Sequence, residues 1–533
     1  MLIDLEQYDG PDTLDADVCV VGAGVAGALL AERLAAAGVD VCLLEAGGAD
    51  FEDRTQALYA GTNAGMDYYP LDGARLRFFG GTANIWGGRC VSLDRIDFER
   101  REWVPYSGWP ITAEDLVPYY RRAHDHLELG EYDYSDDLWA QCDGGRPEFD
   151  ADKFATRFWR FDEQRERFVA GRSPLLHADA RARVVLHANV TRLAAAPNAD
   201  RIERVEVSTL GGRKLSVCAS QVVLAAGAVE NARLLLVSND VQPHGVGNDR
   251  DQVGRYFMEH PHARIGTLDP GSGADFKLWS AFRKRFLPVP IAPVLLASPA
   301  LQRERELLNT AVTFKLQRPT DRGTPLNRRL YLSLKHQLNP TRTGRALWHG
   351  YRDAKKLLQR SVRNSFERTR AAVGATTLHL MVRAEQAPNP ASRVRLDAHE
   401  RDALGVPRVA LDWQLGEQDK HTLNALNAAL GAEFQRLGYG ALRPSEWLAD
   451  DSLAWPVDPT IGNHPIGGYH HMGTTRMSAD PARGVVDADC RVHGYDNLSI
   501  AGSSVFATGG WANPTLTILA LAERLADRLK TLV

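Results

Sequence analysis

The sequence lacks the apolar segments that membrane and exported proteins carry. No stretch approaches the roughly 20 apolar residues that a membrane-spanning helix needs. The strongest candidate, residues 289–297, is short and contains Pro290 and Pro293. Residues 1–17 are acidic and have neither the positively charged start nor the apolar core of a signal peptide. We therefore expect a cytoplasmic protein.

Cysteine is scarce and has no ligand-like spacing. The six cysteines are scattered, with no CxxC pair and no Cys/His spacing of a metal site. This distribution argues against both a zinc centre and a disulfide scaffold. We expect no bound metal.

An overall excess of positive charge is also missing. The chain has 63 Lys and Arg against 67 Asp and Glu, a net charge of −4, which gives no reason to expect a nucleic-acid partner. The charge is unevenly placed, however. Residues 276–370 contain 21 Lys and Arg and 5 Asp and Glu, a local balance of +16, which leaves −20 for the rest of the chain.

The remaining composition is that of an ordinary globular protein, with 44% hydrophobic and 24% charged residues. At roughly 100–200 residues per domain, 533 residues predict two to four domains. A cofactor domain combined with a substrate domain fits this length.

The first chemical signal lies near the start of the chain. An apolar run leads into three glycines with the spacing GxGxxG, Gly22, Gly24 and Gly27. An alanine-rich stretch, a second apolar run and Glu45 follow, so that the acidic residue stands 18 positions beyond the last glycine. The order strand, tight turn, helix, strand and acidic residue predicts a dinucleotide-binding unit.

Each residue of this motif has a physical role in such a unit. Gly22 permits the tight turn, Gly24 lets backbone amides approach a pyrophosphate, and Gly27 lets the helix pack closely on the strand. Glu45 is expected to accept hydrogen bonds from ribose hydroxyls, which disfavours NADP. The alternative is a glycine turn without a ligand, and the motif alone does not distinguish NAD from FAD.

Seven further segments and a turn at 255–261 extend this pattern along the chain. They read GGTANIWGGR at 80–89, VVLAAGAVENARLLL at 222–236, RYFMEHP at 255–261, YHHMGTTRM at 469–477, GVVD at 484–487, RVHG at 491–494, NLSIAGSSVF at 497–506 and ANPTLT at 512–517. Together with the glycine motif they resemble the glucose-methanol-choline (GMC) family of flavoprotein oxidoreductases. The sequence around Trp86, His470 and Asn513 is most similar to the pyranose 2-oxidase and bacterial sugar dehydrogenase branch.

The resemblance implies the fold and its division into domains. It implies an α/β fold, α+β overall, in which a Rossmann-like FAD-binding domain is interleaved with a substrate domain built on an antiparallel sheet with helices. The expected FAD-binding domain comprises residues 1–100, 180–265 and 484–533. The expected substrate domain comprises residues 101–179 and 266–483, and the basic segment 276–370 is its variable part.

The resemblance also implies the cofactor, FAD. Fungal oxidases of that branch carry a flavin-linking histidine directly before the tryptophan, and Ile85 stands at this place here, so we expect non-covalent binding. The residues expected to bind FAD are Gly22, Gly24, Gly27, Glu45, Gly80, Gly81, Asn84, Trp86, Gly87, Gly502, Asn513, Pro514 and Thr515.

Members of the family oxidise an alcohol while a histidine removes the hydroxyl proton and hydride passes from carbon to flavin N5. The match gives His470 as this base, because a neutral imidazole is available near neutral pH. His471 is expected to face the other way in an extended segment. Two alternatives are that both histidines are structural and that they exchange roles.

Asn513 matches the position that hydrogen-bonds the substrate hydroxyl. Followed by Pro514 and an apolar-periodic run, it also fits the N-cap of a helix. The two roles are compatible, because capping uses the amide oxygen and leaves the NH2 group as a donor.

These assignments predict an FAD-dependent enzyme that oxidises a CH–OH group, specifically a secondary hydroxyl of a sugar or glycoside, to a ketone. Oxygen, quinone or a redox protein would accept the electrons. One alternative is a large flavoprotein subunit that transfers electrons within a multi-protein dehydrogenase complex. Another is a GMC-fold enzyme that acts on a non-sugar alcohol, since a fold alone does not prove a reaction.

The basic segment 276–370 allows two interpretations. Apolar residues recur near helical spacing between basic ones from Arg345 to Phe366. This pattern is typical of a helix that docks on an anionic membrane or an acidic redox partner. The interpretation that we favour is an amphipathic helix that packs on the domain or covers the entrance of the active site.

Overall fold

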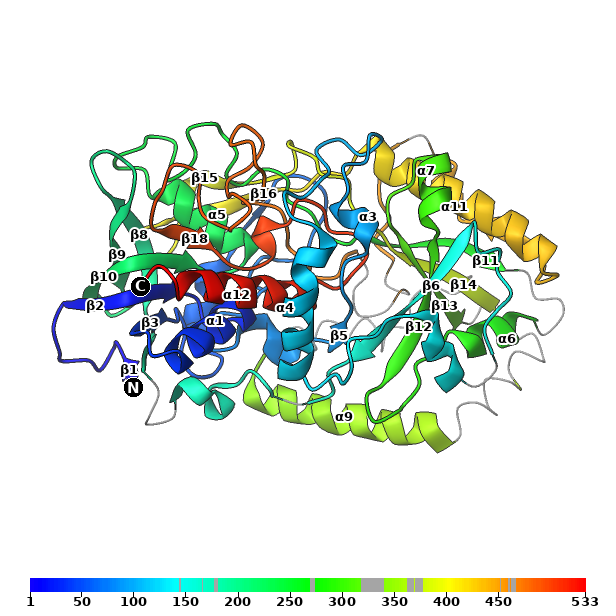
Figure 1. Cartoon of the computed structure of the whole chain (residues 1–533), viewed down its shortest axis with the longest axis horizontal. Helices are drawn as coiled ribbons and strands as arrows, with labels where there is room; N and C mark the ends of the chain where they lie inside the picture. Colours follow the sequence, from blue (N-terminus) through cyan, green and yellow to red (C-terminus); the bar gives the residue numbers. More distant parts are fainter. Residues whose placement is uncertain are drawn as a thin grey trace.

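A computed structural model describes residues 1–533 except 143–144, 165, 177–180, 269–273, 318–339, 362–368, 370–376, 451, 459–460 and 462–465. Two large sheets lie next to each other along the long axis of the molecule (Figure 1). Strands and helices alternate in the first and antiparallel strands dominate the second, which confirms the predicted fold class.

The first sheet has eight strands and contains the predicted dinucleotide unit at its centre. Seven strands run in the order β1-β7-β3-β2-β10-β9-β8, and β18 pairs with β10. The contacts among β1, β7, β3, β2, β10 and β18 are parallel. The bounds are β1 Leu2–Asp4, β2 Thr13–Val21, β3 Val41–Leu44, β7 Ala182–Leu186, β8 Asn189–Ala195, β9 Ile202–Ser208, β10 Lys214–Leu224 and β18 Leu498–Ile500.

Helices cover this sheet. The unit β2–α1–β3, with α1 at Val25–Ala36, confirms the strand, turn, helix and strand expected around the glycine motif. Helix α12, Thr515–Leu529, packs against both α1 and α4, Ala113–His126 (Figure 1). Thr112 caps α4, its hydroxyl accepting from the Asp115 N–H. The remaining helices here are α2 Asp53–Gln56, α3 Arg95–Phe98 and α5 Ala228–Val237.

The second sheet has seven strands in the order β17-β11-β14-β13-β12-β6-β5 and is antiparallel throughout. Its bounds are β5 Arg89–Cys90, β6 Phe154–Phe161, β11 His262–Leu268, β12 Ile291–Ala297, β13 Ala311–Gln317, β14 Thr377–Arg383 and β17 Leu442–Pro444. The helices associated with this part are α6 Ala274–Ala281, α7 Pro299–Arg305, α9 Arg342–Ser361 and α11 Glu417–Arg436.

A small third sheet lies over α5. It joins β4 Gly61–Asn63, β16 Pro407–Asp412 and β15 Arg393–Arg401. Short 3-10 helices complete the chain: η1 Ala57–Tyr59, η2 Gly81–Ile85, η3 Asp136–Gln141, η4 Ala170–Arg172, η5 Pro174–Leu176, η6 Glu446–Leu448 and η7 Ser503–Val505.

The strands of the first sheet all lie within residues 1–100, 180–265 and 484–533, the expected FAD-binding domain. Two strands of the second sheet cross the expected boundary, since β5 lies within residues 1–100 and β11 spans residue 265. The domain division itself stays a prediction.

Helix α9 is the described part of the basic segment's second half, and it runs along one edge of the molecule (Figure 1). Near its start, the Arg345 guanidinium lies 2.9 Å from Asp50 and stacks over the ring of Phe78. Leu347 and Leu357 are exposed. These contacts fit the packed-helix interpretation, and the membrane-surface interpretation stays a prediction. None of the described helices is long and apolar enough to cross a membrane.

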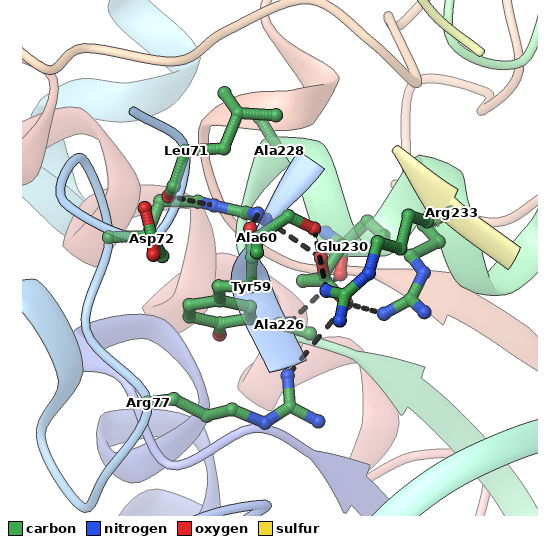
Figure 2. A network of polar contacts seen from close by, with 12 residues as sticks. Tyr59, Ala60, Leu71, Asp72, Arg77, Ala226, Ala228, Glu230 and Arg233 are labelled. Atoms are coloured by element: carbon green, nitrogen blue, oxygen red, sulfur yellow. Dashed lines mark hydrogen bonds and ion pairs between the residues drawn. The ribbon is translucent and has the colours of Figure 1, made fainter. Parts of the chain in front are cut away.

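A buried ionic network fixes the loop between β4 and η2 to the first sheet (Figure 2). Arg75 donates to the Glu230 carboxylate at 2.7 Å, and Arg233 lies 3.3 Å from its other oxygen and 2.6 Å from Asp402. Burial alone would raise the pKa of Glu230, but the guanidinium groups of Arg233, Arg75 and Arg77 outweigh burial and lower this pKa to about 2. The loop, α5 and the small sheet are therefore held around one ionised carboxylate.

We predict that Glu230→Gln lowers the free energy of unfolding by about 3–5 kcal/mol at pH 7, because it leaves buried guanidinium groups without their anion. The folded pKa of about 2 lies below the ordinary value of 4.5, so the stabilisation is present above about pH 4.5 and is lost as the pH falls toward 2. Urea unfolding of both proteins at several pH values from 7 to 3 measures this difference. A difference that stays constant with pH would contradict the assignment.

Candidate active site

One cavity of about 1010 Å³ extends from the glycine turn after β2 to the segment 468–471, and we call it the central cavity. Residues from both large sheets line it. The first sheet contributes the glycine turn and the start of α12, and the second contributes side chains from β5, β6, β11 and β14. A long cleft of this kind can hold an extended dinucleotide and a small substrate together.

The glycines at one end of the central cavity leave the space that a dinucleotide needs. A Cβ built on Gly24, Gly227 or Gly502 would have no atom within 4 Å, and all three residues line the cavity. The backbone is therefore open to a ligand there, as a pyrophosphate site requires. Gly22 has a φ of +103°, which a tight turn requires, and a Cβ on Gly27 would lie 1.9 Å from the Gly22 carbonyl oxygen.

Glu45 also lines the central cavity, directly after β3. Its two carboxylate oxygens accept hydrogen bonds from the N–H groups of Ala23 and Gly47, both at 2.9 Å. Burial raises the pKa of Glu45, and these two hydrogen bonds oppose that rise. The carboxylate is thus fixed beside the glycine turn.

The glycine-rich loop at 80–87 folds into η2 and forms one wall of the central cavity. Gly80, Gly81, Ile85, Trp86 and Gly87 line it. Asn84 is placed differently: its side chain is buried and donates to the Phe79 carbonyl at 2.9 Å, so it stabilises the loop from within.

Gly502, Asn513, Pro514 and Thr515 also line the cavity. The expectation that Asn513 caps α12 is wrong. The helix begins at Thr515 with Pro514 as its cap residue and no side-chain capping bond, and the buried amide oxygen of Asn513 accepts no hydrogen bond within the described part of the chain. The Asn513 amide is turned instead toward His470.

His470 lies between two side chains that determine which of its ring nitrogens carries the proton. Its Nε2 is 3.2 Å from Asn513 Nδ2, and its Nδ1 is 2.7 Å from His260 Nδ1. His260 Nε2 is 2.8 Å from the Gly510 carbonyl oxygen, which can only accept, so His260 carries its proton on Nε2. His260 Nδ1 must then accept from His470 Nδ1–H, and His470 Nε2 keeps a lone pair directed toward Asn513.

Burial keeps His260 neutral. It lowers the pKa of His260 to about 4, although the carbonyl oxygens of Gly510 and Gly509 favour the protonated form. A neutral His260 can accept the hydrogen bond from His470 throughout the physiological pH range.

His471 also lines the central cavity, but its ring contacts a different side chain from that of His470. That the two side chains face opposite ways stays a prediction. Its Nε2 lies 2.9 Å from the Tyr68 hydroxyl, and burial lowers its pKa to about 3. The backbone of the preceding residue, Tyr469, has a φ of +60°, a conformation that is uncommon outside glycine and is often found at functional sites.

The buried carboxylate of Glu259 joins these groups. One oxygen accepts from the backbone N–H groups of His260 and His470 at 2.8 Å and of Gly468 at 3.1 Å. The other accepts from the Tyr68 hydroxyl at 2.5 Å. Glu259 thus fixes the backbone that carries His470 and orients the partner of His471.

The roles of Glu259, His260 and Tyr68 were not predicted from the sequence, in which the turn 255–261 formed only part of a resemblance. His260 and His470 are 210 residues apart, and Tyr68 and Glu259 are 191 apart. No local periodicity connects such positions. The one available signal was the Glu259-His260-Pro261 segment itself.

Comparisons with known proteins agree with this architecture. A family model described as FAD dependent oxidoreductase matches residues 17–246, and one described as GMC oxidoreductase matches residues 388–522. The chain is 28% identical to the 6'''-hydroxyparomomycin C oxidase of Streptomyces lividus, over 96% of this chain and 91% of the relative.

Two further comparisons involve a shorter match and a solved structure. The chain is 26% identical to the fructose dehydrogenase large subunit of Gluconobacter japonicus, over 59% of this chain and 47% of the relative. A formate oxidase structure of Aspergillus oryzae aligns with a TM-score of 0.54 at 18% identity, covering 98% of this chain and 99% of that one. The structural likeness shows a shared fold.

The hydrogen-bond chain predicts a fixed histidine tautomer. In protein labelled with ¹⁵N-histidine, we expect a proton on Nδ1 and none on Nε2 of His470, and the reverse for His260. Because the pKa of His260 is lowered to about 4, its ¹⁵N signals should not titrate between pH 8 and 6. His260→Gln and His470→Gln variants assign the signals. A His470 with its proton on Nε2, or a titration of His260 in this range, would contradict the chain.

Proposed function

The chain is a member of the GMC family of FAD-dependent oxidoreductases, enzymes that act on CH–OH groups, and on this premise we propose that it oxidises a secondary hydroxyl of a sugar or glycoside to a ketone. His470 would be the base, and Asn513 would bind the substrate oxygen. The observation that carries this proposal is the pair formed by His470 Nε2 and Asn513 Nδ2, 3.2 Å apart in the wall of the central cavity.

The residues that line the glycine end of the cavity are those that would hold FAD. The open backbone at Gly24, Gly227 and Gly502 can approach phosphates and a flat ring closely. Glu45 lines the same cavity and would accept hydrogen bonds from the adenosine ribose of such a ligand. Trp86 and Thr515 line the same cavity. We propose that the cofactor is bound non-covalently, since Ile85 occupies the position at which related oxidases carry a flavin-linking histidine.

When bound, FAD supplies the acceptor for the hydride that leaves the reacting carbon. Residues of the chain itself accept the proton that leaves the hydroxyl group. His470 Nε2, which keeps a lone pair, can take the hydroxyl proton of a substrate that approaches Asn513. The Asn513 NH2 group can donate to the substrate oxygen as negative charge develops on it.

His260 and Glu259 support this step without touching the substrate. His260 accepts from His470 Nδ1–H and therefore prevents the proton from residing on Nε2. After proton transfer His470 is an imidazolium, and the carboxylate of Glu259, which binds the His470 backbone N–H at 2.8 Å, favours this positive charge.

The sugar-class substrate is supported by the names of two relatives, an oxidase of hydroxyparomomycin C and a fructose dehydrogenase subunit. Because the fructose dehydrogenase relative is named as a large subunit, a multi-protein dehydrogenase complex stays an alternative for this chain. Among the acceptors oxygen, quinone and a redox protein, recovery of the flavin colour on admission of air distinguishes an oxidase from a dehydrogenase.

Anaerobic mixing of the purified holoenzyme with sugars, glycosides and simple alcohols tests the proposal. We expect a sugar to bleach the flavin absorbance, and His470→Ala to slow bleaching by about 10²–10⁴-fold, the usual weight of general-base catalysis. His399→Ala, an exposed histidine outside the cavity, is the control. Heat denaturation of the same preparation should release FAD from the chain.

Two outcomes would contradict the proposal. If His470→Ala reduces the flavin as fast as the parent protein, His470 is not the base. If no alcohol bleaches a flavin that is demonstrably present, the reaction is not alcohol oxidation.

A further inference from the structure

The part of the central cavity that the second sheet forms carries two guanidinium groups, those of Arg89 and Arg383. Arg89 begins β5 and Arg383 ends β14. Both line the cavity, and both lie over the ring of Trp159, at 5.6 and 5.4 Å from its centroid. Two like charges therefore lie close to the same aromatic ring on β6.

The charge of Arg383 is not neutralised within the described part of the chain. Its side chain makes no ion pair or hydrogen bond with a described residue. The carboxylate nearest in sequence to Arg383, that of Glu385, forms a buried ion pair with Arg101 at 2.6 Å. Glu163, which lines the cavity, lies 2.9 Å from Lys284. Two arginines therefore line the cavity, and the charge of Arg383 has no counter-charge among the described residues.

Two neighbouring cations without an anion are energetically unfavourable in a buried site. Burial lowers the pKa of the Arg383 guanidinium well below its ordinary value, and the neighbouring Arg89 lowers it further. A buried cation without an anion is unfavourable unless a ligand supplies the anion. Guanidinium groups are suited to this role, because they bind carboxylates and phosphates through paired hydrogen bonds.

The two arginines lie on the side of the cavity where the substrate must react. Arg383 pairs with His262 across the β11–β14 ladder, two residues from His260, and its charge acts on His260. His260 in turn contacts His470. The glycines open to a dinucleotide belong to the other sheet, so the anion that meets Arg383 is expected to belong to the substrate.

We propose that the substrate of this enzyme is an acidic sugar, a polyhydroxy compound whose carboxylate or phosphate is bound by Arg383 with Arg89. This inference rests on the proposed function and specifies its substrate class. The anion holds one end of the molecule at the second sheet, and the hydroxyl that reacts lies between His470 and Asn513.

The test compares glucose with glucuronate and glucose 6-phosphate on the holoenzyme. Anaerobic flavin bleaching measures reaction, and thermal stabilisation of the holoenzyme by each compound measures binding without turnover. We expect at least one acidic sugar to bind more tightly than glucose. Arg383→Gln should weaken that binding by about 10–100-fold, the weight of a charge-assisted hydrogen-bonded contact, and leave glucose binding unchanged.

Two further variants keep the result interpretable. Arg383→Lys retains the charge and should recover part of the binding if Arg383→Gln proves unstable. Arg303→Gln, at a half-exposed arginine that pairs with Glu99 outside the cavity, should behave like the parent protein. Raised salt should weaken binding of the acidic sugar more than binding of glucose.

The inference is overturned if glucose binds the parent protein as tightly as both acidic sugars, or if Arg383→Gln weakens neutral and acidic sugars equally. The second result would mean that the guanidinium acts on the flavin or on the cavity wall. Acidic sugars that stabilise the protein through Arg383 without bleaching the flavin would support the anion site and contradict the proposed reaction instead.

Discussion

The buried carboxylate of Glu259 is the contact on which the geometry of the active site depends. It accepts the backbone N–H groups of Gly468, His260 and His470 and the hydroxyl of Tyr68. Burial raises its pKa, and these four hydrogen bonds oppose the rise and favour the anion. Three segments far apart in the sequence are thereby fixed around one negative charge, next to the residue that we assign as the base.

The two parts of the central cavity differ in charge. Near His470 the neighbouring histidines are neutral, since burial lowers the pKa of His260, which contacts His470, to about 4 and that of His471, which lines the cavity, to about 3. Toward the second sheet it presents the guanidinium groups of Arg89 and Arg383. A base without a positive charge and a cationic wall are complementary to a substrate that loses a proton at one end and carries an anion at the other.

The dinucleotide unit could be predicted from the sequence because its determinants are local. Gly22, Gly24 and Gly27 lie within six positions and act through backbone conformation, so their spacing carries the information. By contrast, the contact between His260 and His470 and the ionic network around Glu230 depend on how distant segments pack, and the cap at Pro514 was decided by where the Asn513 side chain finds a partner.

The central claim is that a carbon–hydrogen bond of an alcohol breaks in this cavity while His470 takes the hydroxyl proton. The most direct measurement is the rate constant of anaerobic flavin reduction, in a single turnover at saturating substrate, with the reacting carbon carrying either hydrogen or deuterium. We expect a primary isotope effect, with clearly slower reduction by the deuterated substrate. Equal rate constants for a substrate shown to be bound and oxidised would contradict it.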